Sequence, residues 1–198
     1  MDKKPAKGEY LEILLRSSQT VFSTKDAALL WREERRNIIS SRLNKYAKAG
    51  KLIRVRRGLY AKDNNFDRFE LATRIYTPSY ISFETILAKA GVVFQFYSQI
   101  FVASYVTREV IIDGQTFSYK RIKDSILTNH VGIETKDNYY IASPERAFLD
   151  IISLNRDYHF DNLSPLHWEK VFEILPIYKN KSMEKRVKKY QKLFNKIR

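Results

Sequence analysis

The chain has 198 residues, 44% hydrophobic and 29% charged, which fits one large or two small folded domains. It has no cysteine, which excludes disulfides and thiolate metal sites, and no apolar run approaches the roughly 20 residues that span a bilayer. The net charge of +14 is uneven, with +10 in residues 1–62, −3 in 63–180 and +7 in 181–198, so we expect two regions that face polyanions.

The N-terminal third predicts a helix, a short strand, two further helices and a basic hairpin. The first helix covers residues 9–17, an extended stretch follows at 19–22, and Ser23 or Thr24 caps a second helix that ends near residue 31. A third helix starts at 33–35 and ends at Gly50, because glycine suits a helix C-terminus. Residues 52–56 and 59–61 alternate as strands across the Arg57-Gly58 turn. This order predicts a winged helix-turn-helix.

One face of the predicted third helix is suited to nucleic acid. At 100° per residue, Ile39 and Leu43 lie on its buried face, and small polar and basic side chains lie opposite, where they suit base edges and phosphates. The wing adds arginines for phosphates or a narrow minor groove. Glu33 and Glu34 would repel phosphate, so we expect them to flank the contact region. The predicted DNA-binding residues are Thr24, Arg35, Arg36, Asn37, Ser40, Ser41, Asn44, Lys45, Lys48, Arg54, Arg56 and Arg57.

A polar stretch at residues 62–66 predicts a domain boundary at about Asn65, which gives domains 1–65 and 66–198. The second domain is predicted to be mixed α/β, so the fold class is α+β. Helices are expected at 67–76, after a Ser82 cap, after Ser143-Pro144, and from Ser164-Pro165 to 175. Antiparallel hairpins are expected at 109–120, with a turn at Asp113-Gly114, and at 131–142.

The chain ends in a basic amphipathic helix, which we expect Ser182 to cap. Met183, Val187, Tyr190 and Phe194 recur at spacings of four and three, which predicts a face that packs on the second domain. The opposite face predicts a second basic surface for nucleic acid or an acidic partner, made of Lys185, Lys188, Lys189, Lys192 and Lys196.

The sequence predicts no enzyme, and therefore no catalytic residue, metal or cofactor. Its three histidines have no metal-ligand spacing, and it has neither a phosphate-binding glycine loop nor a nucleophile elbow. The alternative is a metal-dependent nuclease that uses Glu134 and Lys136 with Asp113 or Asp124. Lys136 falls in a predicted turn, which weakens that reading.

Three segments carry a family resemblance. They are residues 50–61 (Gly-Lys-Leu-Ile-Arg-Val-Arg-Arg-Gly-Leu-Tyr-Ala), 78–88 (Pro-Ser-Tyr-Ile-Ser-Phe-Glu-Thr-Ile-Leu-Ala) and 140–150 (Tyr-Ile-Ala-Ser-Pro-Glu-Arg-Ala-Phe-Leu-Asp). Together they resemble the AbiEi family of antitoxins and transcriptional regulators from bacterial abortive-infection toxin–antitoxin systems. The last segment is the most specific for the family. Its residues nevertheless indicate a structural role, as the start of a helix on which Arg146 and Asp150, four residues apart, can form an ion pair.

The resemblance implies a winged helix that represses its own operon by binding promoter repeats. It also implies a second domain with antitoxin activity and a nucleotidyltransferase-like toxin, AbiEii, encoded alongside as a partner. Residues 1–8 lack the apolar core of a signal peptide, which favours a cytoplasmic protein with no membrane partner. We therefore predict a non-enzymatic autorepressor and antitoxin that binds double-stranded DNA, monomeric in solution and cooperative on DNA. A regulator without a cognate toxin is the further alternative.

Overall fold

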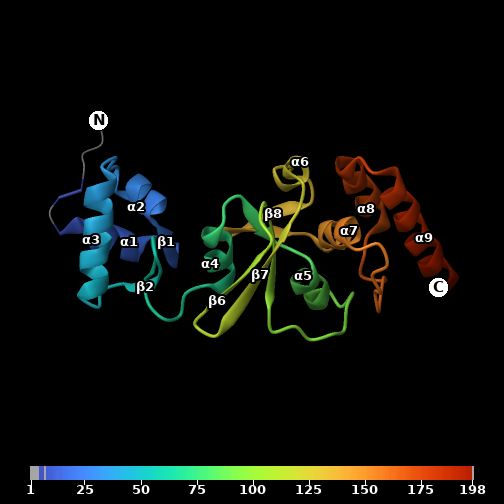
Figure 1. Cartoon of the computed structure of the whole chain (residues 1–198), viewed down its shortest axis with the longest axis horizontal. Helices are drawn as coiled ribbons and strands as arrows, with labels where there is room; N and C mark the ends of the chain where they lie inside the picture. Colours follow the sequence, from blue (N-terminus) through green and yellow to red (C-terminus); the bar gives the residue numbers. More distant parts are fainter. Residues whose placement is uncertain (1–4, 7, 198) are drawn as a thin grey trace. The chain divides into compact units, whose positions relative to one another are not determined.

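The computed structural model describes residues 5–6 and 8–197, without the side chain of Ile197. Most of residues 1–8, which were expected to lack the features of a signal peptide, therefore lies outside the described residues. The chain divides into two compact units, Met1–Ile75 and Tyr76–Arg198 (Figure 1). The predicted boundary at Asn65 falls inside the first unit. The reason is that the helix after this position packs against the first strand of the first unit instead of joining the second.

The first unit combines four helices with a small antiparallel sheet among its described residues. Its strands are hydrogen-bonded in the order β1-β3-β2. The predicted order of elements is confirmed, although α3 begins only after Arg35. In chain order the elements are α1 (Glu9–Arg16), β1 (Val21–Ser23), α2 (Thr24–Trp31), α3 (Arg36–Lys48), β2 (Ile53–Arg56), β3 (Leu59–Ala61) and α4 (Arg68–Ile75).

A compact apolar core holds the helices of the first unit on its sheet. Leu14 of α1, Trp31 of α2 and Leu43 of α3 meet Phe22 and Tyr60 from the strands, and all five are buried. The Trp31 indole N–H donates to the Tyr10 carbonyl at 2.7 Å, so its polar atom is satisfied inside the core. Each such side chain contributes about 1.5–3 kcal/mol on burial.

The second unit is built on one mixed six-stranded sheet in the order β6-β7-β5-β4-β9-β8. Both predicted hairpins are confirmed, and Asp113 and Gly114 adopt the positive φ angles of a tight hairpin turn. Parallel pairing of β5 with β7 and of β4 with β9, together with antiparallel pairing of β4 with β5, joins the hairpins into one sheet. The elements are β4 (Ser79–Ile81), α5 (Glu84–Lys89), β5 (Ile100–Ser104), β6 (Arg108–Ile112), β7 (Gln115–Arg121), α6 (Asp124–Leu127), β8 (Ile133–Lys136), β9 (Tyr139–Ala142), α7 (Pro144–Leu154), α8 (Trp168–Ile174), η1 (Leu175–Tyr178) and α9 (Lys181–Ile197).

Helix α7 is the centre of the second unit, where it contacts α5, α8, α9 and β9 (Figure 1). The predicted Ser143 cap is confirmed, because the hydroxyl accepts a hydrogen bond from the Arg146 N–H at 3.2 Å. Three other helix starts differ from the prediction. Ser82 does not cap α5, since its hydroxyl donates to Asp150, and α8 starts at Trp168, after the Ser164-Pro165 turn. Asn180, not Ser182, accepts the Met183 N–H at the start of α9.

The predicted pair of Arg146 and Asp150 is confirmed and fully buried, with Nε and Oδ1 3.4 Å apart. The guanidinium also donates to the carbonyls of Ile126 and Val131, at 2.7 and 2.8 Å. Asp150 accepts from the hydroxyls of Tyr178 at 2.6 Å, Ser82 at 2.8 Å and Tyr80 at 2.9 Å. Burial raises the pKa of Asp150, while the Arg146 charge opposes that rise. The motif therefore ties four separate segments to α7, which is a structural role.

Candidate nucleic-acid interface

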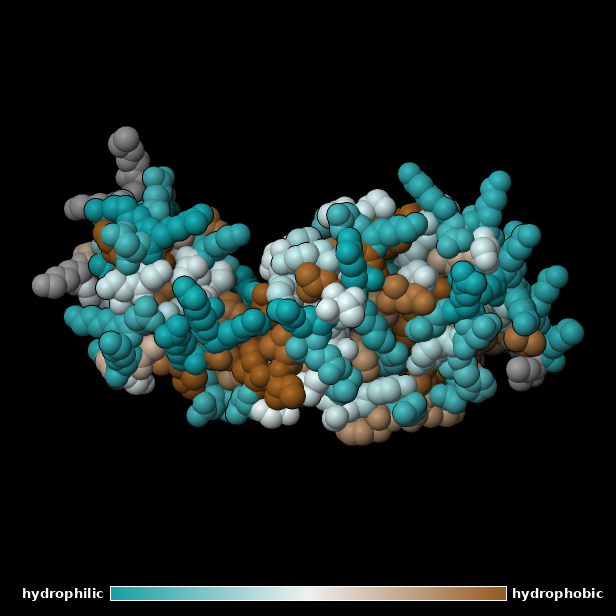
Figure 2. Space-filling view, in the orientation of Figure 1, coloured by the Kyte–Doolittle hydropathy of each residue, from teal (hydrophilic) through white to brown (hydrophobic). Residues whose placement is uncertain are grey.

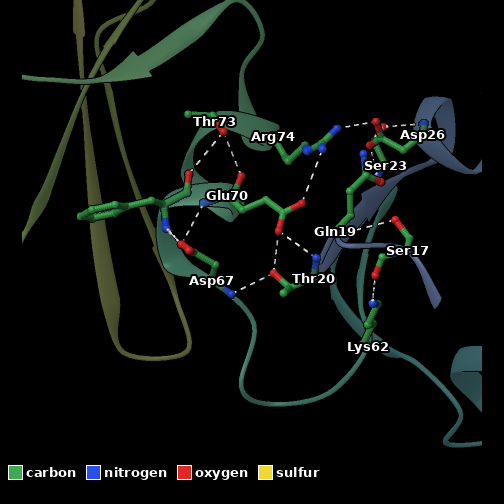
Figure 3. A network of polar contacts seen from close by, with 11 residues as sticks. Ser17, Gln19, Thr20, Ser23, Asp26, Lys62, Asp67, Glu70, Thr73 and Arg74 are labelled. Carbon is green, nitrogen blue, oxygen red and sulfur yellow. Dashed lines mark hydrogen bonds and ion pairs between the residues drawn. The ribbon is translucent and has the colours of Figure 1, made fainter. Parts of the chain in front are cut away.

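The start of α2 is fixed by its own cap and by α4 (Figure 3). The Ser23 hydroxyl accepts from the Asp26 N–H, and the Asp26 carboxylate accepts from the Ser23 N–H at 2.7 Å, which forms a capping box. Arg74 of α4 makes an ion pair with the same carboxylate. Asp26 therefore joins the first helix of the predicted helix-turn-helix to the last helix of the unit.

Glu70 provides the second part of this contact. It is only 1% exposed, and its Oε2 accepts from the Thr20 N–H at 2.8 Å and from the Thr20 hydroxyl at 2.7 Å (Figure 3). The Thr20 Oγ1 in turn accepts from the Asp67 N–H at 2.9 Å. We call Thr20, Asp26, Glu70 and Arg74 the α4 contact. Because it anchors both the residue that precedes β1 and the cap of α2, α4 supports the position of α2.

Helix α3 presents the polar face that its periodicity predicts. Ile39 and Leu43 are buried, whereas Asn37, Ser41 and Lys45 are exposed on the other side. Figure 2 shows mainly hydrophilic surface where α3 lies. Asn37, Ser41 and Lys45 also line a shallow hollow of about 350 Å³ together with Ile38 and Arg42. Arg36 and Lys48 are exposed near the two ends of the helix, and Ser40 is half-buried at the margin.

Two predicted DNA-binding residues are held by intramolecular contacts that the helical periodicity does not reveal. The Asn44 Oδ1 accepts a hydrogen bond from the Tyr60 hydroxyl at 2.8 Å, so Asn44 joins α3 to β3 and is half-buried. Arg35 is the N-cap residue of α3, and its Nε and Nη2 donate to the two carboxylate oxygens of Glu33 at 2.9 and 3.0 Å. The Glu33 hydrogen bond raises the pKa of Arg35 and offsets its charge. Asn44 and Arg35 thus have intramolecular partners, although the Arg35 side chain is 64% exposed.

Arg42 is a structural residue of α3, because its guanidinium carbon lies 3.3 Å from the centre of the Tyr10 ring in α1.

Near the start of α2, Lys25 is an exposed cation that the sequence prediction did not include. It lines a hollow of about 770 Å³ with Thr24, Arg32 and Arg36. Its position next to the predicted Thr24, in the first turn of α2, was the signal that could have identified it.

The hairpin of β2 and β3 carries the predicted wing arginines. Arg54 and Arg56 are exposed on β2, whereas Ile53 and Val55 are half-buried. The pairing with β3 shifts between Arg54 and Arg56, so a bulge lies within the strand. Arg57 is exposed in the turn, where Gly58 has a φ of 79° that favours glycine. The β2–β3 hairpin therefore presents exposed cations.

The lysines of the predicted second basic surface are all exposed on α9. Met183 and Val187, on the opposite face, are fully buried, which confirms the packing side of this helix. The surface consists of Lys185, Lys188, Lys189, Lys192 and Lys196.

The nuclease alternative does not bring Asp113 together with Glu134 and Lys136. Glu134 and Lys136 are exposed on β8 at one edge of the sheet, whereas Asp113 lies in the turn next to β6 at the other edge. Five inter-strand steps of about 4.8 Å separate these edges by about 24 Å. Asp124 starts α6, which lies between β7 and β8 in the chain and is not part of the sheet. Among the described residues, no group of three or more His, Asp or Glu side chains forms a metal site.

Residues 9–61 match the family model AbiEi_4, described as a transcriptional regulator, AbiEi antitoxin. The match covers α1 to β3, so it confirms the family resemblance for this part of the chain, whereas the segments 78–88 and 140–150 lie outside the matched residues. No curated protein matches the chain. In the described part of the chain, no helix has the length and apolar character needed to traverse a membrane.

Proposed function

From the match of residues 9–61 to the AbiEi antitoxin regulators, we propose that the first unit is a winged helix-turn-helix that binds double-stranded DNA. The observation that carries the proposal is the exposed polar face of α3 beside the arginine-rich hairpin, within the matched residues. Helices α2 and α3 form the helix-turn-helix, with residues 32–35 as the turn. The β2–β3 hairpin is the wing.

In this arrangement α3 is the helix that enters the major groove. Asn37 and Ser41 are short and exposed, so they suit base edges, while Lys45, Lys48 and Arg36 suit the flanking phosphates. The exposed Arg54 and Arg57 of the wing suit the neighbouring backbone or minor groove. Because most of these groups contact phosphate, we expect binding that weakens strongly with salt.

We further propose that the chain represses its own operon by binding promoter repeats, as a monomer that binds DNA cooperatively, and that it is the cytoplasmic, non-enzymatic antitoxin of an abortive-infection system. The support is the matched description, transcriptional regulator and antitoxin. The partner in this proposal is an AbiEii-like nucleotidyltransferase toxin encoded alongside. The second unit, with the exposed lysines of α9, is the part available for the antitoxin role.

Gel shifts test the DNA-binding part of the proposal. Full-length protein is titrated onto the duplex upstream of its own gene and onto a shuffled duplex of the same length and composition, at several salt concentrations. We expect preference for the upstream duplex at moderate salt. Equal affinity for the two duplexes would contradict repression of its own promoter.

Co-expression tests the antitoxin part. The neighbouring toxin gene is induced with or without this chain under an unrelated promoter, so that repression plays no role. We expect growth to recover with the intact chain and with a wing variant in which Arg54, Arg56 and Arg57 are alanine. If growth recovers with neither the intact chain nor the wing variant, the antitoxin role is contradicted. The proposal would then be reduced to a DNA-binding regulator.

A further inference from the structure

The bulge in β2 places the two arginines of this strand on opposite faces of the hairpin. Arg54 is the partner of Tyr60 in β3. Arg56 is the partner of Leu59, so the register shifts between the two arginines. Side chains of directly paired residues lie on the same face of a sheet. Tyr60 and Leu59 are consecutive in β3, so their side chains point to opposite faces. The two arginines therefore do so as well, whereas a regular strand would place them on one face.

Arg54 lies on the face that packs against α3. Its partner Tyr60 belongs to the helical core of the first unit and is 2% exposed. The Tyr60 hydroxyl donates to the Asn44 Oδ1 of α3 at 2.8 Å, which fixes this face of the hairpin to α3. The Cβ atoms of directly paired residues are about 4.5–5.5 Å apart. The exposed Arg54 is therefore a neighbour of α3, on the side where the exposed Lys48 follows Asn44 by one turn.

Arg56 lies on the other face and points away from α3. Its partner Leu59 is also paired with Ser23 of β1 and does not belong to the helical core that contains Tyr60. Strand side chains stand roughly perpendicular to the sheet, so the guanidinium groups of Arg54 and Arg56 diverge instead of meeting at one phosphate. Arg57 is exposed in the turn that follows. The hairpin thus presents cations in two opposite directions and at its tip.

These directions correspond to the two sides of a groove in duplex DNA. One phosphate strand separates the major groove from the minor groove next to it, and a second strand borders the minor groove on its far side. With α3 in the major groove, the α3 side of the hairpin faces the strand between the grooves, and the opposite side faces the far strand. The minor groove is only about 6 Å wide, so both strands are close to a hairpin tip that lies over it.

We propose that Arg54 and Arg56 contact phosphates of different DNA strands. Arg54 binds the strand between the two grooves, Arg56 binds the far strand of the minor groove, and Arg57 lies over the groove between them. The bulge causes this division, because without it both arginines would face the same strand. The inference rests on the proposed function, since it requires α3 to bind duplex DNA.

Phosphate-ethylation interference tests the division strand by strand. The probe is a duplex with a single repeat from the region upstream of the gene, so that one copy of the full-length protein binds and the two strands stay distinguishable. For the wild type, ethylation should block binding at phosphates on both strands. Arg54→Ala should remove the block on one strand only, and Arg56→Ala on the other strand only. Lys136→Ala, which removes an exposed cation of the second unit, is the matched control and should keep the wild-type pattern.

The salt dependence of binding gives an independent measurement. Each alanine variant should lower the slope of log affinity against log salt by about 0.9, and the double variant by about 1.8, because separate phosphates are contacted. Arg54→Lys and Arg56→Lys keep a cation and should keep the slope, and circular dichroism checks the fold of every variant.

Three results would overturn the proposal. They are loss of the block on the same strand in both alanine variants, an unchanged pattern in either of them, and a double variant whose slope equals that of a single variant. A wild type whose binding is blocked on neither strand would instead contradict the proposed DNA binding itself.

Discussion

Replacing Arg146 with methionine tests the structural role assigned to the most specific motif. Methionine keeps much of the volume but removes the cation and its donors from a site with 0% exposure. The Ile126 and Val131 carbonyls would lose bonds from a charged donor, worth about 1.5–3 kcal/mol each. Breaking a buried pair on one side costs about 3–5 kcal/mol, and these contributions overlap. We expect the second unit to lose about 4 kcal/mol of unfolding free energy at pH 7.

Urea titration followed by tryptophan fluorescence measures this loss, because Trp168 lies in the second unit and Trp31 in the first. Only the transition of the second unit should move to lower urea. The double variant Arg146→Met with Asp150→Leu should recover much of the loss, since it leaves no unpaired buried charge. A loss below about 1 kcal/mol for the single variant would refute the reasoning.

The loss should also depend on pH. Burial raises the pKa of Asp150 above its ordinary value of 3.8, and removal of Arg146 raises it further because that charge opposes the rise. Between the ordinary pKa of Asp150 in the unfolded state and its raised pKa in the folded variant, the folded state binds more protons than the unfolded state. The stability of the variant therefore falls as pH rises through that window. The single variant should therefore be closer to wild type near pH 4 than at pH 7. A deficit that does not change with pH would show that Asp150 is not the group left unpaired.

Three further predictions concern the first unit. Alanine at Arg54, Arg56 and Arg57 should lower the slope of log affinity against log salt by up to about 2.7, at about 0.9 per phosphate contact, and an unchanged slope would remove the wing from the interface. In competition binding, Asn37→Ala should relax the preference for one DNA sequence over another. Asn44→Ala should instead destabilise the first unit by about 1 kcal/mol, because the hydrogen bond from Tyr60 is lost. The reverse pattern would contradict the observed contact between Asn44 and Tyr60. Arg74→Met should destabilise the first unit by about 3 kcal/mol, because it leaves Glu70 and Asp26 without their cation, and an unchanged melting temperature would show that the α4 contact is not stabilising.

The amino-acid sequence by itself determined the elements whose signals are local. The Ser143 cap, the Asp113-Gly114 turn and the Arg57-Gly58 turn were predicted, because each depends on backbone conformation within a few residues. The outward face of α3 followed from helical periodicity, since burial of Ile39 and Leu43 requires Asn37 and Ser41 to lie opposite. The exposure of Arg54 and Arg56 also followed from strand alternation, although the bulge between them did not.

The tertiary structure alone decided what depends on segments far apart in the chain. Asn44 is outward by periodicity, but the Tyr60 hydroxyl reaches it from β3. Ser82 has the sequence context of a helix cap, yet its hydroxyl bonds to Asp150, 68 residues away. Helix α4 joins the first unit because Glu70 satisfies Thr20, 50 residues earlier. A side chain with several possible partners takes the one that packing brings within reach, and packing depends on the whole fold instead of the local sequence.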